Sequence, residues 1–312
     1  QVFGIKEYVL SGGKANGVRA FDVRNGSGLE FTVLADRGLD IAELSFRGTN
    51  CSYLSKTGIL SPEYYEENNL GFLRSFYAGF LTTCGLRNVG SPCEENGEAF
   101  GLHGRISNTP AEEVCAKTEW IDNAPVFTVS GKMREARVFG EHLALHRKIS
   151  CRYGENRILI QNTVENLGFK KEKLMLLFHF NLGYPLLDED ALLLTPTEQL
   201  IPRDEEAARG EAFFGRCQEP TPGYAEQVFY HNLRSALINP GREIGVAIHF
   251  NQKQLFNFTQ WKQMGEGEYV LGMEPCNCYV GGRTDSRNEG MIEYLEPGEV
   301  RNFDLTIEFL NG

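Results

Sequence analysis

The sequence has 312 residues, of which 41% are hydrophobic and 23% are charged, so it can bury a large core and lacks the polar bias of disordered chains. Its formal net charge is −11, and an acidic chain repels the phosphates of nucleic acids and of anionic lipids. We therefore expect neither a nucleic acid nor a membrane as its partner.

The predicted elements are short strands throughout the chain. Residues 17–51 alternate between apolar and polar types and are broken at Asn25-Gly26 and Gly48-Thr49, which is typical of strands joined by tight turns. Two polar segments, 61–70 and 203–213, are the helical candidates, and we expect both to be short surface connectors. Strand-like stretches then follow one another at 125–135, 143–153, 156–168, 173–183, 243–251, 254–261, 268–275 and 302–310.

Many evenly spread strands with no Pro/Gly/Ser-rich linker between them favour one folding unit. The sequence therefore predicts an all-β protein, a large two-sheet antiparallel β-sandwich that spans residues 1–312 as a single domain.

Polar groups in apolar or glycine-rich surroundings mark the candidate site. His179 lies in the apolar stretch LMLLFHFNLGYP, and in a strand it projects to the same face as Asn181. A core histidine bonded to a carbonyl and a histidine that contacts a ligand both fit this pattern. His103, in GLHGR, and Glu274, near a strand end before a proline, each fit a surface position as well as a ligand site. Arg105 follows His103 by two residues and would share its face in an extended segment.

Several motifs together resemble the aldose 1-epimerase superfamily, and most closely its DUF4432 branch. They are ADRGLDI at 35–41, FLRSF with TTCGL at 72–86, GLHGRISNTPAE at 101–112, HFNLGYPLL at 179–187, QWK at 260–262 and LGMEPCN at 271–277. The resemblance implies a galactose mutarotase-like β-supersandwich with a sugar cleft across one sheet.

The resemblance also implies roles for individual residues. Glu274 matches the general base that acts on the C1 hydroxyl, and His179 matches the general acid that acts on the ring oxygen. His103 matches a second histidine that binds near the ring oxygen. Arg74 is the best candidate for an arginine that contacts sugar hydroxyls, with Arg87 as its competitor.

The resemblance implies further substrate contacts, for which the residues of this sequence match the family's motifs less directly. Glu226 is the candidate for an acidic residue that grips hydroxyls, while Trp261 would stack on a sugar face and Lys262 would contact a hydroxyl or an anion. Trp261 and Lys262 also fit ordinary packing on a strand. Asn181, Arg105 and Asn277 complete the predicted binding residues.

The expected activity is interconversion of sugar anomers by ring opening and reclosure, which needs one acid and one base on opposite sides but no metal or organic cofactor. Two alternatives stay open. One is a phospho-sugar epimerase, in which Arg74, Arg105, Arg283 or Lys262 would hold a phosphate. The other is a carbohydrate-binding protein without turnover.

The cysteines and the chain start bear on metal binding and location. The eight cysteines lack the paired spacing of zinc sites, and Cys276 and Cys278 lie closer together than zinc pairs usually do. No apolar run approaches the roughly 20 residues that span a bilayer, and no charged-then-apolar leader opens the sequence. We expect reduced thiols, no metal site and a cytoplasmic protein.

Overall fold

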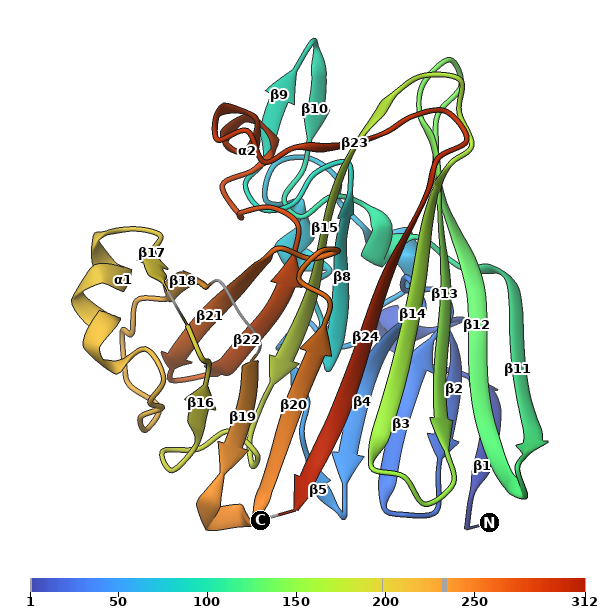
Figure 1. The fold of residues 1–312 in the computed structure, drawn as a ribbon, viewed down its shortest axis with the longest axis vertical. Helices are drawn as coiled ribbons and strands as arrows, with labels where there is room; N and C mark the ends of the chain where they lie inside the picture. Colours follow the sequence, from blue (N-terminus) through green and yellow to red (C-terminus); the bar gives the residue numbers. More distant parts are fainter. Residues whose placement is uncertain (1, 198, 232–234, 312) are drawn as a thin grey trace.

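The computed structural model describes residues 2–197, 199–231 and 235–311 (Figure 1). An N-terminal sheet of five antiparallel strands opens the fold, in spatial order along the chain. Its strands are β1 (Gly4–Val9), β2 (Arg19–Arg24), β3 (Leu29–Leu34), β4 (Asp40–Phe46) and β5 (Thr49–Asn50).

An eight-stranded antiparallel sheet forms one layer of the molecule, in the order β11-β12-β13-β14-β24-β20-β19-β16. Long strands dominate it and they run side by side in Figure 1. They are β11 (Glu112–Ile121), β12 (Ala124–Ala136), β13 (His142–Arg152), β14 (Arg157–Asn166), β24 (Val300–Asn311), β20 (Ile244–Phe250), β19 (Ser235–Asn239) and β16 (Leu192–Leu194).

A seven-stranded sheet carries the segments that the sequence marks as functional. Its order is β17-β18-β21-β22-β15-β23, and β8 also pairs with β15. The strands are β17 (Leu200–Pro202), β18 (Gln227–His231), β21 (Asn257–Gly265), β22 (Glu268–Cys276), β15 (Glu172–Leu182), β23 (Glu293–Leu295) and β8 (Leu81–Leu86).

Small ribbons and short helices fill the connections. The ribbons are β6 (Tyr53–Leu54) with β7 (Ala78–Gly79), and β9 (Cys93–Glu95) with β10 (Glu98–Phe100). The helices are η1 (Gly13–Ala15), η2 (Pro62–Tyr64), η3 (Gly71–Arg74), η4 (Ile106–Asn108), α1 (Glu205–Gly210), η5 (Glu211–Phe213), η6 (Pro240–Arg242) and α2 (Arg283–Asn288). Both helical candidates of the sequence thus contain short helical connectors, and the Asp204 side chain caps α1 by accepting from the backbone N–H of Ala207.

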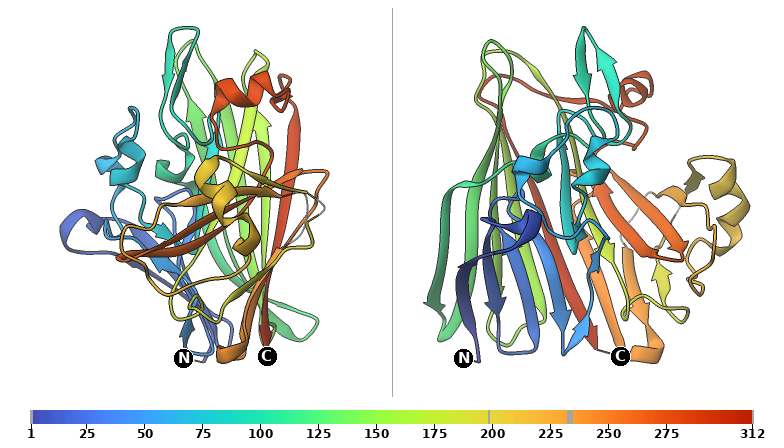
Figure 2. Two further views of the ribbon diagram at one scale, coloured as in Figure 1. Left: turned by 90° about the vertical axis from the view of Figure 1, so that its left-hand side faces the viewer. Right: turned by 180° about the vertical axis from the view of Figure 1, so that it is seen from behind.

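The main core lies between the eight-stranded sheet and the other two sheets (Figure 2). It takes Phe31 from the N-terminal sheet, Phe127 from the eight-stranded sheet, and Phe178 and Phe180 from β15. The antiparallel β-sandwich is therefore confirmed, with its second layer divided into two sheets that meet where the backbone N–H of Phe80 donates to the carbonyl of Ala42.

The alternation of side chains along β15 and β22 positions the site. Phe178 and Phe180 face the main core, as Leu271 and Met273 do on β22. Because successive residues of a strand face opposite sides, His179 and Glu274 face away from this core.

Candidate active site

His179 and Glu274 lie opposite each other on neighbouring strands. The pairs Leu177–Cys276 and Phe180–Met273 set the register of β15 against β22, and this register aligns the two residues. The Nε2 atom of His179 lies 3.1 Å from Oε1 of Glu274, and the two side chains are only 6% and 2% exposed. The fold therefore joins the predicted acid and the predicted base from two distant parts of the chain.

A cavity of about 340 Å³ opens above this pair. His103, Trp261 and Glu226 line it together with the pair. The ring centroids of His103 and Trp261 lie 5.8 and 5.4 Å from that of His179. The other lining residues are Leu70, Phe72, Leu73, Phe76, Gly90, Ser91, Leu102, Arg203, Val228, Thr259 and Val280.

Burial favours the neutral form of each ionisable group at the cavity floor. It lowers the pKa of His179 to about 3, with a further contribution from His103, and it lowers the pKa of His103 to about 4. The pKa of the Glu274 carboxyl is raised well above its usual value, mainly by burial and also by the negative charge of Glu226, while Arg203 opposes this shift. The resting site thus favours a carboxylic acid beside a neutral imidazole.

Two atoms at the floor have unused hydrogen-bonding capacity. Among the described residues, Nδ1 of His179 and Oε1 of Glu274 have no hydrogen-bond partner, since the 3.1 Å contact between the two side chains is not aligned as a hydrogen bond. A buried polar atom without a partner costs about 1–3 kcal/mol.

The loop conformation orients His103. Its backbone has φ of 59°, and its Nδ1 accepts from the backbone N–H of Gly90 at 3.3 Å. In a neutral imidazole the proton is then on Nε2, so His103 retains one ring donor.

Arg203 and Trp261 fix the carboxylate of Glu226. The indole N–H of Trp261 donates to Oε2 at 2.8 Å, and Nη2 of Arg203 lies 3.1 Å from Oε1. Sequence reasoning did not identify Arg203, which lies in a polar segment with no distinguishing pattern. It also missed Thr259, although a period of two from Trp261 along β21 would have placed it on the cavity face.

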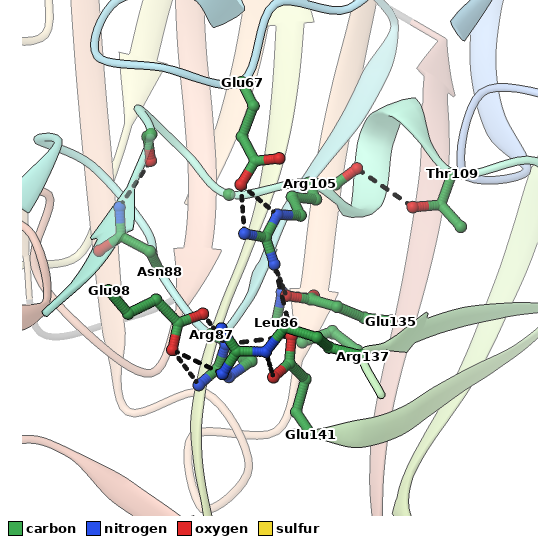
Figure 3. Close-up of polar contacts among 12 residues, drawn as sticks. Glu67, Leu86, Arg87, Asn88, Glu98, Arg105, Thr109, Glu135, Arg137 and Glu141 are labelled. Carbon is green, nitrogen blue, oxygen red and sulfur yellow. Dashed lines mark hydrogen bonds and ion pairs between the residues drawn. The ribbon is translucent and has the colours of Figure 1, made fainter. Parts of the chain in front are cut away.

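Two predicted arginines lie outside the cavity. Arg74 is 74% exposed and pairs with Glu66 at 3.4 Å. Arg105 extends from the loop after His103 to Glu67, because the backbone there turns into η4 and is not an extended strand. Figure 3 shows Arg105 beside the guanidinium groups of Arg87 and Arg137, together with the carboxylates of Glu67, Glu98, Glu135 and Glu141.

Three further predicted contacts also lie outside the cavity and instead support the strands. Asn181 is fully buried and donates to the carbonyl of His179 at 2.9 Å. Lys262 follows Trp261 and so faces the opposite side of β21, where its Nζ donates to the carbonyl of Phe213. Asn277 accepts from the backbone N–H of Leu176 at 2.7 Å.

The described part of the chain contains no group of three or more His, Cys, Asp or Glu residues placed to hold a metal ion. Cys276 and Cys278 are buried as free thiols in an apolar cluster with Phe72 and Leu177. No helix within the described ranges is long and apolar enough to cross a membrane.

Comparison with solved structures identifies the class of fold. A putative aldose 1-epimerase from Klebsiella pneumoniae is 26% identical, with a TM-score of 0.94 over 98% of this chain and 83% of that one. A galactose mutarotase-like protein from Clostridium acetobutylicum is 12% identical, with a TM-score of 0.72 over 99% of both chains. Galactose 1-epimerase from Lactobacillus acidophilus is 15% identical, with a TM-score of 0.62 over 99% of both chains.

The fold is thus that of the galactose mutarotase-like proteins. Within this class, residues 15–309 match the family described as domain of unknown function DUF4432, and the chain belongs to that family. No curated protein sequence matches it.

Proposed function

We propose that this protein is an aldose 1-epimerase-like isomerase that interconverts the anomers of a reducing sugar. The observation that carries the proposal is the contact between His179 and Glu274 at the floor of a cavity that also contains His103 and Trp261. Hemiacetal opening requires an acid and a base that both reach the anomeric centre, whereas simple sugar binding does not require them.

The geometry fits the two oxygens that react. Ring opening removes the proton of the C1 hydroxyl and adds a proton to the ring oxygen, and both oxygens are bonded to C1. Because the two side chains are 3.1 Å apart, we assign them to the same side of the sugar and not to opposite sides as expected from the sequence. Glu274 takes the hydroxyl proton and His179 protonates the ring oxygen, which gives the free aldehyde. Rotation about the C1–C2 bond and reclosure with reversed roles give the other anomer.

The neutral resting pair is compatible with these roles. A carboxylic acid beside a neutral imidazole holds the same number of protons as a carboxylate beside an imidazolium. The two forms differ only in which of the two side chains holds the proton. Either residue can thus act as the acid or as the base, so the pair can catalyse both ring opening and ring closure, as a reversible anomerisation requires.

The remaining cavity residues support recognition of a sugar. Trp261 offers an aromatic face, and Glu226 presents a carboxylate that Arg203 and the indole N–H hold in place. This arrangement offers both donors and acceptors to hydroxyl groups, and we assign substrate contacts to these three residues and to His103.

The test is anomer exchange measured by saturation-transfer NMR on a panel of reducing sugars. We expect the protein to accelerate exchange, and we expect Glu274→Gln and His179→Asn each to lower the rate by about 10²- to 10⁴-fold. Glu119→Gln, on the exposed edge strand β11, is the control and should keep the wild-type rate. Equal acceleration by wild type and Glu274→Gln would exclude the mechanism.

The two alternatives make different predictions in this assay. A phospho-sugar epimerase would accelerate only phosphorylated sugars. The four cations expected to hold the phosphate each have another partner: Arg74 has Glu66, Arg105 has Glu67, Arg283 has Glu95, and Lys262 has the carbonyl of Phe213. A carbohydrate-binding protein would bind a sugar without accelerating exchange.

A further inference from the structure

A second depression, of about 670 Å³, adjoins the cavity with the histidines. Leu73, Phe76 and Trp261 line both and form the wall that they share. Phe76 and Trp261 pack together in this wall with their ring centroids 6.3 Å apart. A ligand that is too long for the inner cavity would pass over this wall into the second depression.

The second depression combines aromatic rings with hydroxyl groups. Tyr53 and Tyr64 lie along it, and Tyr64 is 46% exposed. Ser55 and Thr57 line it as well, and their hydroxyl oxygens are 3.0 Å apart. Aromatic faces cover the C–H faces of a sugar ring, while hydroxyls exchange hydrogen bonds with its edges.

The charged groups of the depression are largely paired with one another. Lys56 contacts Glu268, and Arg74 lies 3.4 Å from Glu66. Lys14 lies over the ring of Tyr64, 5.5 Å from its centroid. A phosphate group needs cations that converge on it, whereas paired cations and carboxylates offer donors and acceptors side by side. The depression therefore suits a neutral ligand with many hydroxyl groups.

We propose that this depression is a subsite for a second glycosyl unit, so that the substrate is the reducing end of a disaccharide or longer oligosaccharide. This inference rests on the proposed function, because the anomeric carbon must lie against His179 and Glu274. The next sugar unit then lies over the wall of Phe76 and Trp261 and against Tyr64, and Arg74 contacts the hydroxyls of this second unit.

The experiment compares glucose with maltose, cellobiose, lactose and isomaltose, which all carry glucose at the reducing end. Saturation-transfer difference NMR reports which protons of each sugar touch the protein. We expect contacts on both rings of at least one disaccharide, and we expect Tyr64→Ala to remove those on the second ring while those on the reducing ring persist. Tyr294→Ala, a partly exposed tyrosine that lines neither depression, is the matched control.

Anomer-exchange rates supply an independent measurement. For that disaccharide, Tyr64→Ala should lower kcat/KM by roughly three- to tenfold through KM, the range expected for one aromatic contact, while kcat/KM for glucose stays unchanged. An equal effect on glucose and on the disaccharide would contradict the subsite.

The failure of this inference and the failure of the proposed function give different results. The subsite is overturned if saturation-transfer difference signals appear only on the reducing ring of every disaccharide, or if no disaccharide gives such signals. This holds even if the protein accelerates the anomer exchange of glucose. A second result would also overturn the subsite: glucose 6-phosphate binds more tightly than glucose, and Lys14→Ala removes this difference. The depression would then hold an anion. Contacts on both rings without any acceleration of exchange support the subsite and overturn the enzymatic proposal.

Discussion

The protonation of Glu274 depends on two charged neighbours in addition to burial. The negative charge of Glu226 raises the pKa of the Glu274 carboxyl, and the positive charge of Arg203 lowers it. The two neighbours also bind each other, at 3.1 Å. Glu226, which we assign to substrate contact, thus also raises the pKa of Glu274, which we assign to proton transfer.

Replacement of Glu226 and replacement of Arg203 should shift the pKa of Glu274 in opposite directions. In Glu226→Gln the pKa should fall because a nearby negative charge is lost, so Glu274 ionises at lower pH than in the wild type. In Arg203→Gln the pKa should rise. The carboxyl carbon signal of Glu274, followed by NMR across a pH titration, measures both shifts. Shifts of the same sign in the two variants would contradict this electrostatic account.

Gly272 leaves room for the carboxylate of Glu274. A Cβ atom at this position would lie 2.4 Å from Oε1 of Glu274 and 2.9 Å from Cβ of Trp261. We expect Gly272→Ala to displace the carboxylate and to reduce anomer exchange at least tenfold, with little change in far-UV circular dichroism. Gly265→Ala on the same hairpin is the control, since the nearest atoms to its Cβ are the far end of the Gln263 side chain and the carbonyl oxygen of Glu268, and none belongs to the cavity. Equal activity of the two variants would show that the space is not needed.

At the scale of elements, a buried arginine joins strands from all three large sheets. Arg147 on β13 contacts Asp40 at the start of β4, the hydroxyl of Thr83 on β8 at 2.7 Å, and the side-chain oxygen of Asn162 on β14 at 2.7 Å. The side chains of Arg147 and Asp40 are 0% and 1% exposed. This network fixes the site-bearing sheet against the rest of the sandwich.

Removal of this arginine should be costly for stability. Arg147→Ala leaves the carboxylate of Asp40 buried without its cation, which typically destabilises a protein by about 3–5 kcal/mol. The exposed pair of Arg157 and Glu308 is the comparison, and Arg157→Ala should cost at most about 1 kcal/mol. Urea denaturation of both variants measures the difference. Similar losses in the two would mean that the buried network does not stabilise the fold.

At the scale of the whole molecule, buried neutral histidines make stability depend on pH. Burial lowers the pKa of His231 to about 4, as it does for His103, and that of His179 to about 3, from an ordinary value of 6.5. Between these values and 6.5 the unfolded chain binds protons that the folded chain does not. The stability contributed by these groups is therefore complete above pH 6.5 and is lost as the pH falls towards 3 to 4.

The stability contributed by these histidines should accordingly fall as the pH is lowered from 7 to 4, while the raised pKa values of Glu135, about 7, and of Glu274 act in the opposite direction. His231→Gln should make this decline shallower, by up to about 1.4 kcal/mol per pH unit, because one such histidine is removed at a position outside the cavity. Calorimetry at several pH values measures both slopes. An unchanged slope in the variant would show that His231 takes up its proton equally in both states.

The thiols should report how compactly the molecule is folded. All eight cysteines are free, and Cys115 on β11 is exposed while Cys51, Cys84, Cys151, Cys276 and Cys278 are buried. We expect a thiol reagent to modify Cys115 first in the native protein, and the five buried thiols only on unfolding. Rapid modification of more than the three accessible or partly accessible thiols of the native protein would contradict the packing described above.

The sequence by itself predicted the strand-rich fold and five of the residues that line the cavity. Alternation of apolar and polar residues predicts strands because it follows directly from the geometry of the chain. His179, His103 and Glu274 stand out because each lies in or beside an apolar or glycine-rich frame. The resemblance to the aldose 1-epimerase superfamily implied their roles and added Trp261. The single-domain organisation stays a prediction.

Only the tertiary structure decided which charged residues surround the cavity. Arg203 enters it and Arg105 leaves it because loops and turns, which have no fixed period, set the direction of both side chains. The 3.1 Å contact between His179 and Glu274 depends on the register of two strands far apart in the sequence. Local patterns determine which face a strand residue takes, but the register between strands follows from packing of the whole core.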